Sequence, residues 1–125
     1  MKKIWIFIAL SGALAVTIGA MSTHILKDIM QAEDITRIQT AATYQMYHTL
    51  MIAALVVCSQ RISFKSIDQS IWLFIAGIVL FSGSLYLYTL TKLHGFVFVT
   101  PVGGVLLILG WLSVARLAFV CAKLK

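Results

Sequence analysis

Charged residues are scarce in this chain. Asp, Glu, Lys and Arg make up 11% of its 125 residues and hydrophobic residues make up 61%, whereas an ordinary soluble domain carries about 25% charged residues. A soluble protein of this size needs more charge to cover its surface. The apolar residues also come in blocks as long as a membrane is thick, so a soluble globular domain is not predicted.

The chain has few cysteines and lacks common catalytic motifs. Cys58 and Cys121 are the only cysteines, without CxxC or Cys-His spacing, so we predict neither a disulfide framework nor a metal site and expect two small apolar side chains. The chain lacks a nucleophile elbow, an HExxH motif and a phosphate loop. A Ser84–His48 pair would have no carboxylate in the membrane to orient its histidine. We therefore predict no enzyme and no cofactor.

Four apolar blocks of about 20 residues fill most of the chain, at 4–25, 38–59, 71–90 and 101–122. A helix of that length crosses the hydrocarbon core and satisfies its own backbone groups there. Strands are not predicted, because the blocks are continuous and twice as long as a barrel strand. The expected fold is all-α: one polytopic membrane domain, residues 1–125, with four transmembrane helices in a compact bundle.

The first block has an alternative interpretation as a signal peptide. "MKKIWIFIALSGALAVTIGAMS" has a basic start followed by small residues. Its apolar run is about twice the usual length of a signal-peptide core. We therefore expect a retained first span, with cleavage near Ala20 as the alternative.

Basic residues lie at the ends of the blocks and predict the orientation. The net charge is +6, but flanking charges of this kind anchor helices, so nucleic acid is not an expected partner. Four spans place both tails and the middle loop on one side, with seven of the ten Lys and Arg; the other side has Lys27, Arg37 and Lys92. The positive-inside rule therefore predicts cytoplasmic termini in a bacterial inner membrane.

Three segments at the block ends need interpretation. Residues 30–41 look helical, and we expect an extension of the second span rather than a separate interfacial helix. The fourth helix is expected to start at "TPVGG", with Thr100 as its cap and Pro101 in its first turn; the alternative is one longer helix through Pro101. We expect Arg116 to extend to the inner interface rather than form a substrate site.

Polar side chains gather in the outer half of the predicted bundle. Gln45 and His48 in "ATYQMYHTL" (41–49) share a helix face, as do Tyr44 and His48. Serines and tyrosines recur near the outer end of the third block. The candidate binding residues are His24, Tyr44, Gln45, His48, Ser82, Ser84 and Tyr86.

Three interpretations of these residues are open. The first is interhelical hydrogen bonding, since an unpaired polar group in lipid is costly. The second is a small-ligand or ion site, because intramembrane ionisable residues are functional candidates. The third is a metal or haem site on His24 and His48, which nothing in their spacing specifies. We favour the first and assign no metal ligand.

Four separated motifs resemble a known family: "GAMSTHIL" at 19–26, "TAATYQMYHTL" at 40–50, "FSGSLYLYTLT" at 81–91 and "TPVGGVLLILGWL" at 100–112. They are similar to a YgdD/YwdK-like family of small bacterial inner-membrane proteins of unknown function, to which the eukaryotic transmembrane protein 256 is related. Members usually read "GAFGAHGL" in the first motif, so this chain keeps His24 and replaces a Gly-Ala pair by Ser22 and Thr23. The resemblance implies a four-span inner-membrane protein. It does not point to an activity, because the function of the family is not established.

The family signature falls at several further positions of this chain. These are Tyr44, Gln45, His48, Ser82, Gly83, Ser84, Tyr86, Thr100, Pro101, Gly103, Gly104, Gly110 and Trp111. We predict a non-enzymatic accessory protein or a bundle that binds a lipid or small ligand; the alternative is a small oligomeric transporter or channel. The expected partner is the lipid bilayer, and self-association or membership of a larger membrane complex stays open.

Overall fold

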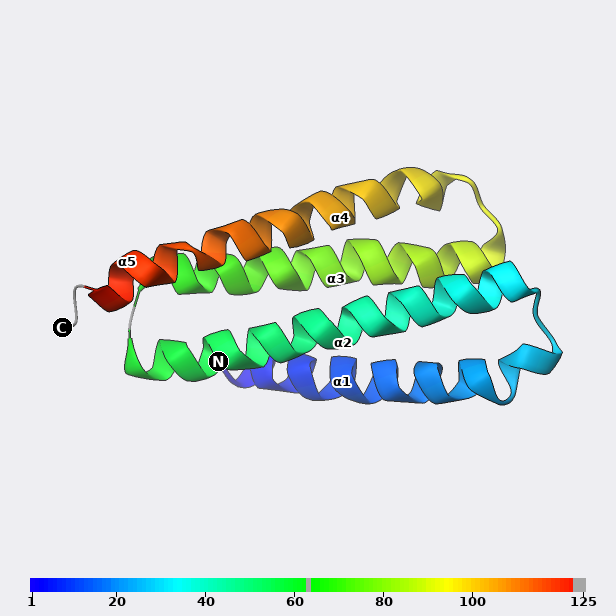
Figure 1. Cartoon of the computed structure of the whole chain (residues 1–125), viewed down its shortest axis with the longest axis horizontal. Coiled ribbons are helices and arrows are strands. Elements are labelled where there is room, and N and C mark those ends of the chain that lie inside the picture. Colours follow the sequence, from blue (N-terminus) through cyan, green and yellow to red (C-terminus); the bar gives the residue numbers. More distant parts are fainter. Residues whose placement is uncertain (63, 123–125) are drawn as a thin grey trace.

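The structure, a computed structural model, describes residues 1–62 and 64–122, except for the side chain of Cys121. The predictions made for that side chain, Lys123 and Lys125 lie outside this part. The described elements are all helical: α1 (Lys2–Thr23), the 3₁₀ helix η1 (Leu26–Asp28), α2 (Ala32–Arg61), α3 (Lys65–Thr91), α4 (Gly95–Val114) and α5 (Arg116–Ala122) (Figure 1). No strand occurs among these residues, which confirms the all-α prediction.

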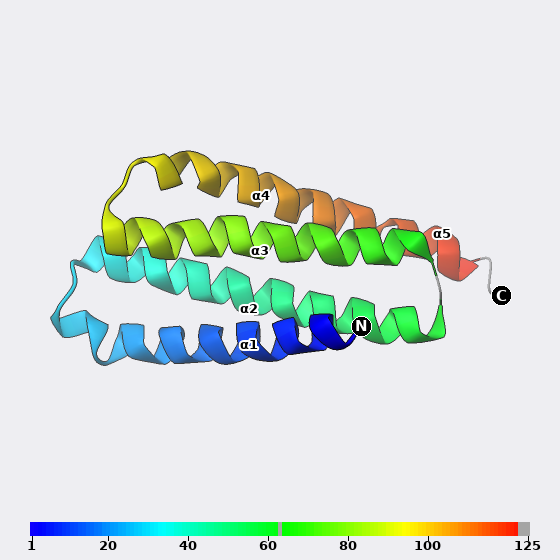
Figure 2. The same cartoon turned by 180° about the vertical axis from the view of Figure 1, so that it is seen from behind.

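Four helices of the described chain are long and apolar enough to cross a membrane. They are α1, α2, α3 and the stretch Gly95–Val120, in which α5 continues α4. Each helix packs on the next one in sequence. They run alternately up and down, so η1 and the α3–α4 connection share one end, called the distal end below (Figures 1 and 2). The four-helix bundle is therefore as predicted.

The hydrophobic core lies between α2, α3 and α4. Its buried members are Ile52, Leu55, Val56, Ile67, Ile71, Phe74, Ile78 and Leu107. α1 contributes only half-buried side chains to it, such as Phe7. Large apolar side chains elsewhere point outward, including Leu90 and Phe98, which are 73% and 77% exposed. Such an exterior suits lipid, which solvates apolar side chains as well as a protein interior does.

Glycines let α3 and α4 approach closely. A Cβ on Gly103 would collide with the backbone of α3 at Phe81 and would lie 2.7 Å from the Leu80 carbonyl carbon. One on Gly110 would lie 2.9 Å from the ring of Phe74, and one on Gly77 would meet Leu107. Because lipid gives no hydrophobic drive for helix association, such close contact stabilises the pair through dispersion.

The second span begins earlier than its apolar block. α2 starts at Ala32 rather than residue 38, so the polar stretch extends the span, as expected. Glu33 and Asp34 lie in its first turn, where the helix dipole favours acidic side chains.

The prediction that the fourth helix begins at Thr100 and Pro101 is wrong. α4 begins at Gly95 and continues through Pro101, as in the alternative interpretation. A loop over residues 95–99 would leave several backbone groups unpaired beside lipid, whereas a proline inside a helix removes only one donor. The helix is therefore the less costly arrangement.

Replacing Gly103 by Ala should destabilise the bundle. The added methyl group forces the backbones of α3 and α4 apart, and overpacking of this kind costs about 1–3 kcal/mol. The free energy of unfolding in detergent, followed by circular dichroism, measures the loss. Gly104→Ala is the matched control, because its Cβ would lie 3.7 Å from the ring of Phe81, an ordinary contact. Equal stability of the two variants would contradict the close approach.

Candidate functional site

Gln45 joins three helices. Its side chain is 4% exposed and its Nε2 donates to the Ser11 carbonyl oxygen at 2.9 Å and to the Ser11 hydroxyl at 3.2 Å. Its Oε1 accepts a hydrogen bond from the Tyr86 hydroxyl at 2.7 Å. The amide of α2 therefore links α1 to α3, and hydrogen bonds satisfy both of its ends.

Short hydroxyl bonds extend this network. The Ser11 and Thr49 hydroxyls lie 2.7 Å apart, which adds a second link between α1 and α2. Ser82 of α3 donates to the Ala41 carbonyl of α2 at 2.8 Å. Ser84 of α3 lies 2.6 Å from the Thr100 hydroxyl of α4. Each neighbouring pair of the long helices, α1–α2, α2–α3 and α3–α4, thus shares at least one side-chain hydrogen bond.

His48 is buried among aromatic rings. Its Nδ1 bonds the Tyr44 carbonyl oxygen in the preceding turn of α2. Since a carbonyl only accepts, the neutral ring carries its proton on Nδ1. The imidazole stacks on the Tyr44 ring and lies 5.7 Å from Phe74 of α3 and 6.1 Å from Trp111 of α4, between centroids. His48 therefore packs against neighbouring helices while its hydrogen bond stays within its own helix.

His24 lies apart from the other candidate residues. It is exposed at the C-terminal end of α1, where its backbone N–H bonds the Met21 carbonyl. Tyr44 is also largely exposed, with its ring edge-on to Phe81. Among residues 1–62 and 64–122, no group of three or more His, Cys, Asp or Glu side chains lies together in a way that could hold a metal ion. The structure therefore brings together Gln45, Ser82 and Tyr86, but not His24.

Ser11 and Asp34 make polar contacts that the sequence did not predict. Ser11 is the partner of Gln45, but its small size in an apolar block indicates helix packing just as well. Asp34 accepts hydrogen bonds from Arg37 and from Lys92, 58 residues away. Nothing in the sequence signals a pair at that separation.

Arg116 is exposed and bonds α3. Its Nη1 donates to the Gln69 side-chain oxygen at 3.0 Å. Gln69 lies near the start of α3, at the end opposite the distal one. This position agrees with a side chain that reaches the interface.

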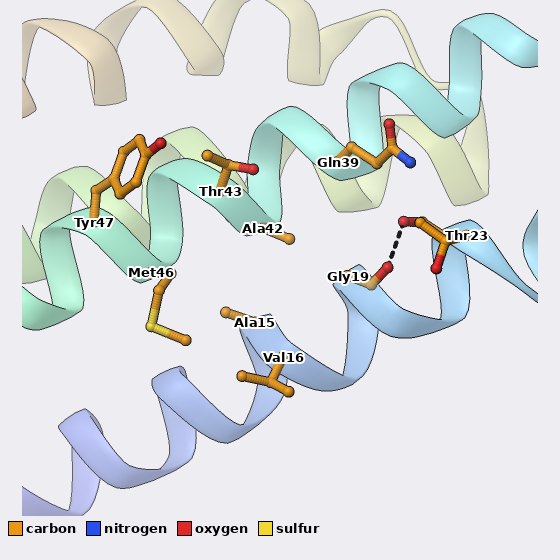
Figure 3. Close-up of a pocket in the computed structure, with 10 residues that line it drawn as sticks. Ala15, Val16, Gly19, Thr23, Gln39, Ala42, Thr43, Met46 and Tyr47 are labelled. Atoms are coloured by element: carbon orange, nitrogen blue, oxygen red, sulfur yellow. Dashed lines mark hydrogen bonds between the residues drawn. The ribbon is translucent and has the colours of Figure 1, made fainter.

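A groove opens between α1 and α2 in their distal halves (Figure 3). Its volume is about 470 Å³. Ala15, Val16 and Met46 line one end, and Thr23 and Gln39 lie at the other. Thr43 and Tyr47 also line it, with Tyr47 beside Met46. The large apolar side chains of the groove thus lie toward the middle of the bundle, and its distal end is polar.

Comparison with known proteins identifies the family. Residues 18–104 match the family described as "Protein of unknown function (DUF423)". The chain belongs to the DUF423 family. This match includes Gln45, His48 and Tyr86, whereas Ser11 and Trp111 lie outside it.

Relatives of this DUF423 protein are membrane proteins. The UPF0382 inner membrane protein YgdD of Escherichia coli K12 is 47% identical over 85% of this chain and 81% of its own. A UPF0382 membrane protein of Haemophilus influenzae is 38% identical over 94% of each chain. One from Staphylococcus saprophyticus is 41% identical over 90% of this chain and 92% of its own. No solved structure matches significantly.

The Gln45–Tyr86 bond should contribute measurably to stability. In a double-mutant cycle with Gln45→Met and Tyr86→Phe, we expect a coupling energy of about 0.6 kcal/mol, the average for such bonds in membranes. The free energy of unfolding in detergent or bicelles measures it. A second cycle pairs Gln45→Met with Tyr47→Phe, whose side chain is 59% exposed, and should show no coupling. Equal coupling in both cycles would contradict a specific bond.

Proposed function

We propose that this DUF423 protein is a non-enzymatic accessory protein of the bacterial inner membrane that binds an amphiphilic molecule from the bilayer in the α1–α2 groove. The polarity of that groove carries the proposal. A molecule with a polar head and an apolar tail would meet Thr23 and Gln39 with its head and Ala15, Val16 and Met46 with its tail (Figure 3). Ligand sites of this kind are mostly apolar with a few placed polar groups.

The hydrogen-bond network supports a role without catalysis. Gln45 uses its amide on neighbouring helices, and the Ser82 and Ser84 hydroxyls are bonded as well. No buried side-chain nitrogen or oxygen of the described residues lacks a partner. Groups that are engaged in this way stabilise the bundle rather than act on a substrate.

A small oligomeric transporter or channel is the weaker proposal. It would need polar side chains along a wet passage, between helices or between copies. The inward-facing polar side chains of the described bundle instead bond one another or backbone carbonyls, and the two ends of the Gln45 amide are both engaged. Self-association and assembly into a larger membrane complex remain compatible with the accessory role.

A bulky residue at Gly19 should block the groove. Gly19 lines it, and a Cβ there would meet nothing within 4 Å, so Gly19→Leu places its Cβ in open space and the rest of its side chain in the groove. We expect the purified variant to retain less co-purifying lipid or other amphiphile than the wild type, measured by mass spectrometry of solvent extracts.

Gly12→Leu is the matched control for this experiment. Gly12 lies on the same helix and its Cβ is equally free, but it does not line the groove. It should retain the ligand as the wild type does. If both variants keep the same amphiphiles in the same amounts, the groove is not the binding site.

We also propose that both termini face the cytoplasm. The positive-inside distribution supports this, since, of the Lys and Arg residues that the structure describes, only Lys27, Arg37 and Lys92 lie toward the distal side of the four spans. A fluorescent protein fused after Lys125 should be fluorescent, whereas alkaline phosphatase fused there should be inactive. Alkaline phosphatase inserted after Asp28 should be active. The reverse pattern of activities would overturn the orientation.

A further inference from the structure

Basic side chains are few at the distal end, and two of them converge. Arg37, one turn into α2, and Lys92, which caps α3, both donate to the carboxylate of Asp34. Asp34 is 7% exposed. One carboxylate cannot neutralise two cations, so the cluster keeps a net charge of +1.

An aromatic ring lies beside the two cations. The Arg37 guanidinium carbon is 4.7 Å from the centroid of the Tyr88 ring, and the Lys92 ammonium is 5.9 Å from it. Contact with the ring face stabilises both cations. Tyrosine is also typical of the level of the lipid headgroups, so the cluster is placed where a headgroup would lie.

Lys92 has a backbone conformation that favours glycine. Lys92 has φ 57°, in the left-handed region. Glycine is the usual residue at such a helix end, because a Cβ is unfavourable there. Lys92 occupies this position, and its side chain bonds Asp34 of α2.

A cavity adjoins the cluster. It has a volume of about 350 Å³ and is lined by Arg37, Leu85, Tyr88, Val97, Thr100 and Pro101. Val97 and Pro101 are exposed on the outer face of α4, where acyl chains would run. The cavity therefore has a cationic, aromatic end and an apolar end that opens to lipid.

We propose that this cavity binds an anionic phospholipid, with its phosphate on Arg37, which lines the cavity, and one acyl chain along Val97 and Pro101. Lys92 does not line the cavity but adds positive charge next to Arg37, because both side chains bond Asp34. A guanidinium has five N–H donors in a planar fork. Only Nη1 of Arg37 bonds Asp34, so donors remain for a phosphate. Charge-assisted bonds of arginine to phosphate are among the strong hydrogen bonds. The cavity shares no lining residue with the α1–α2 groove, so this site does not depend on the proposed function.

Native mass spectrometry of the full chain in detergent tests the site. Phosphatidylglycerol and phosphatidylethanolamine with identical acyl chains are titrated separately. We expect wild type to prefer phosphatidylglycerol, and Arg37→Gln to lose about tenfold in affinity for it, the loss of one charge-assisted bond. Lys27→Gln removes the same charge at the same end without touching the cavity, so it should bind as wild type does.

Further variants keep the result interpretable if Arg37→Gln unfolds. Lys92→Gly suits the left-handed backbone and should fold while binding phosphatidylglycerol more weakly. Arg37→Lys keeps the charge but loses the planar fork, and should fall between wild type and Arg37→Gln. If Lys92→Gly and Arg37→Lys both bound phosphatidylglycerol with wild-type affinity, the proposed site would be wrong.

Two more arms separate the alternatives. If Gly19→Leu abolishes the preference for phosphatidylglycerol while Lys92→Gly keeps it, the headgroup binds in the α1–α2 groove and the present site is wrong. If inorganic phosphate alone binds as tightly as the lipid, the site holds a free anion and the lipid assignment is wrong. A preference that survives Gly19→Leu and is lost in Lys92→Gly supports the site even if the α1–α2 groove binds nothing.

Discussion

Hydrocarbon offers no hydrogen-bond partner, and this constraint determines where the polar side chains of the bundle lie. Gln45 has a donor end and an acceptor end, and the structure satisfies them on α1 and α3 respectively. Serine and threonine hydroxyls that face inward bond a neighbour or a carbonyl of their own helix. These bonds determine how α2 is rotated about its axis, because a rotation that turned Gln45 away from α1 and α3 would leave its amide unpaired in lipid.

The four helices are held by different means. α3 and α4 approach through glycines at 77, 103 and 110, where backbones or rings fill the space of a side chain. α1 has only three buried residues, Ser11, Ala15 and Ser22. Its attachment therefore relies on the bonds of Ser11, on small side chains and on half-buried side chains such as Phe7 that pack on the core. This light packing leaves the groove beside α2 open.

Both cavities that carry a proposal lie at the distal end, on different sides of α2. The α1–α2 groove has neutral polar side chains at its distal end and apolar side chains further in. The Arg37 cavity has a cation and an aromatic ring next to apolar side chains. Amphiphiles in one leaflet would meet both in the same orientation. The two proposed sites thus share one physical basis, a polar or charged part beside an apolar part on the outer surface of the bundle.

The sequence by itself determined the four spans, the all-α class and the polar extension of α2, because length and hydropathy are local properties that a window of residues carries. It also grouped Gln45 with the polar residues of the third span, though without naming Ser11 or Tyr86 as its partners. Only the tertiary structure decided that α4 starts at Gly95, that His24 stands apart, and that Lys92 meets Asp34. The start of α4 depends on the surroundings of residues 95–99, where a loop would leave backbone groups unpaired beside lipid. The other two outcomes depend on helix rotation and on contacts between residues far apart in the chain, which no local pattern specifies.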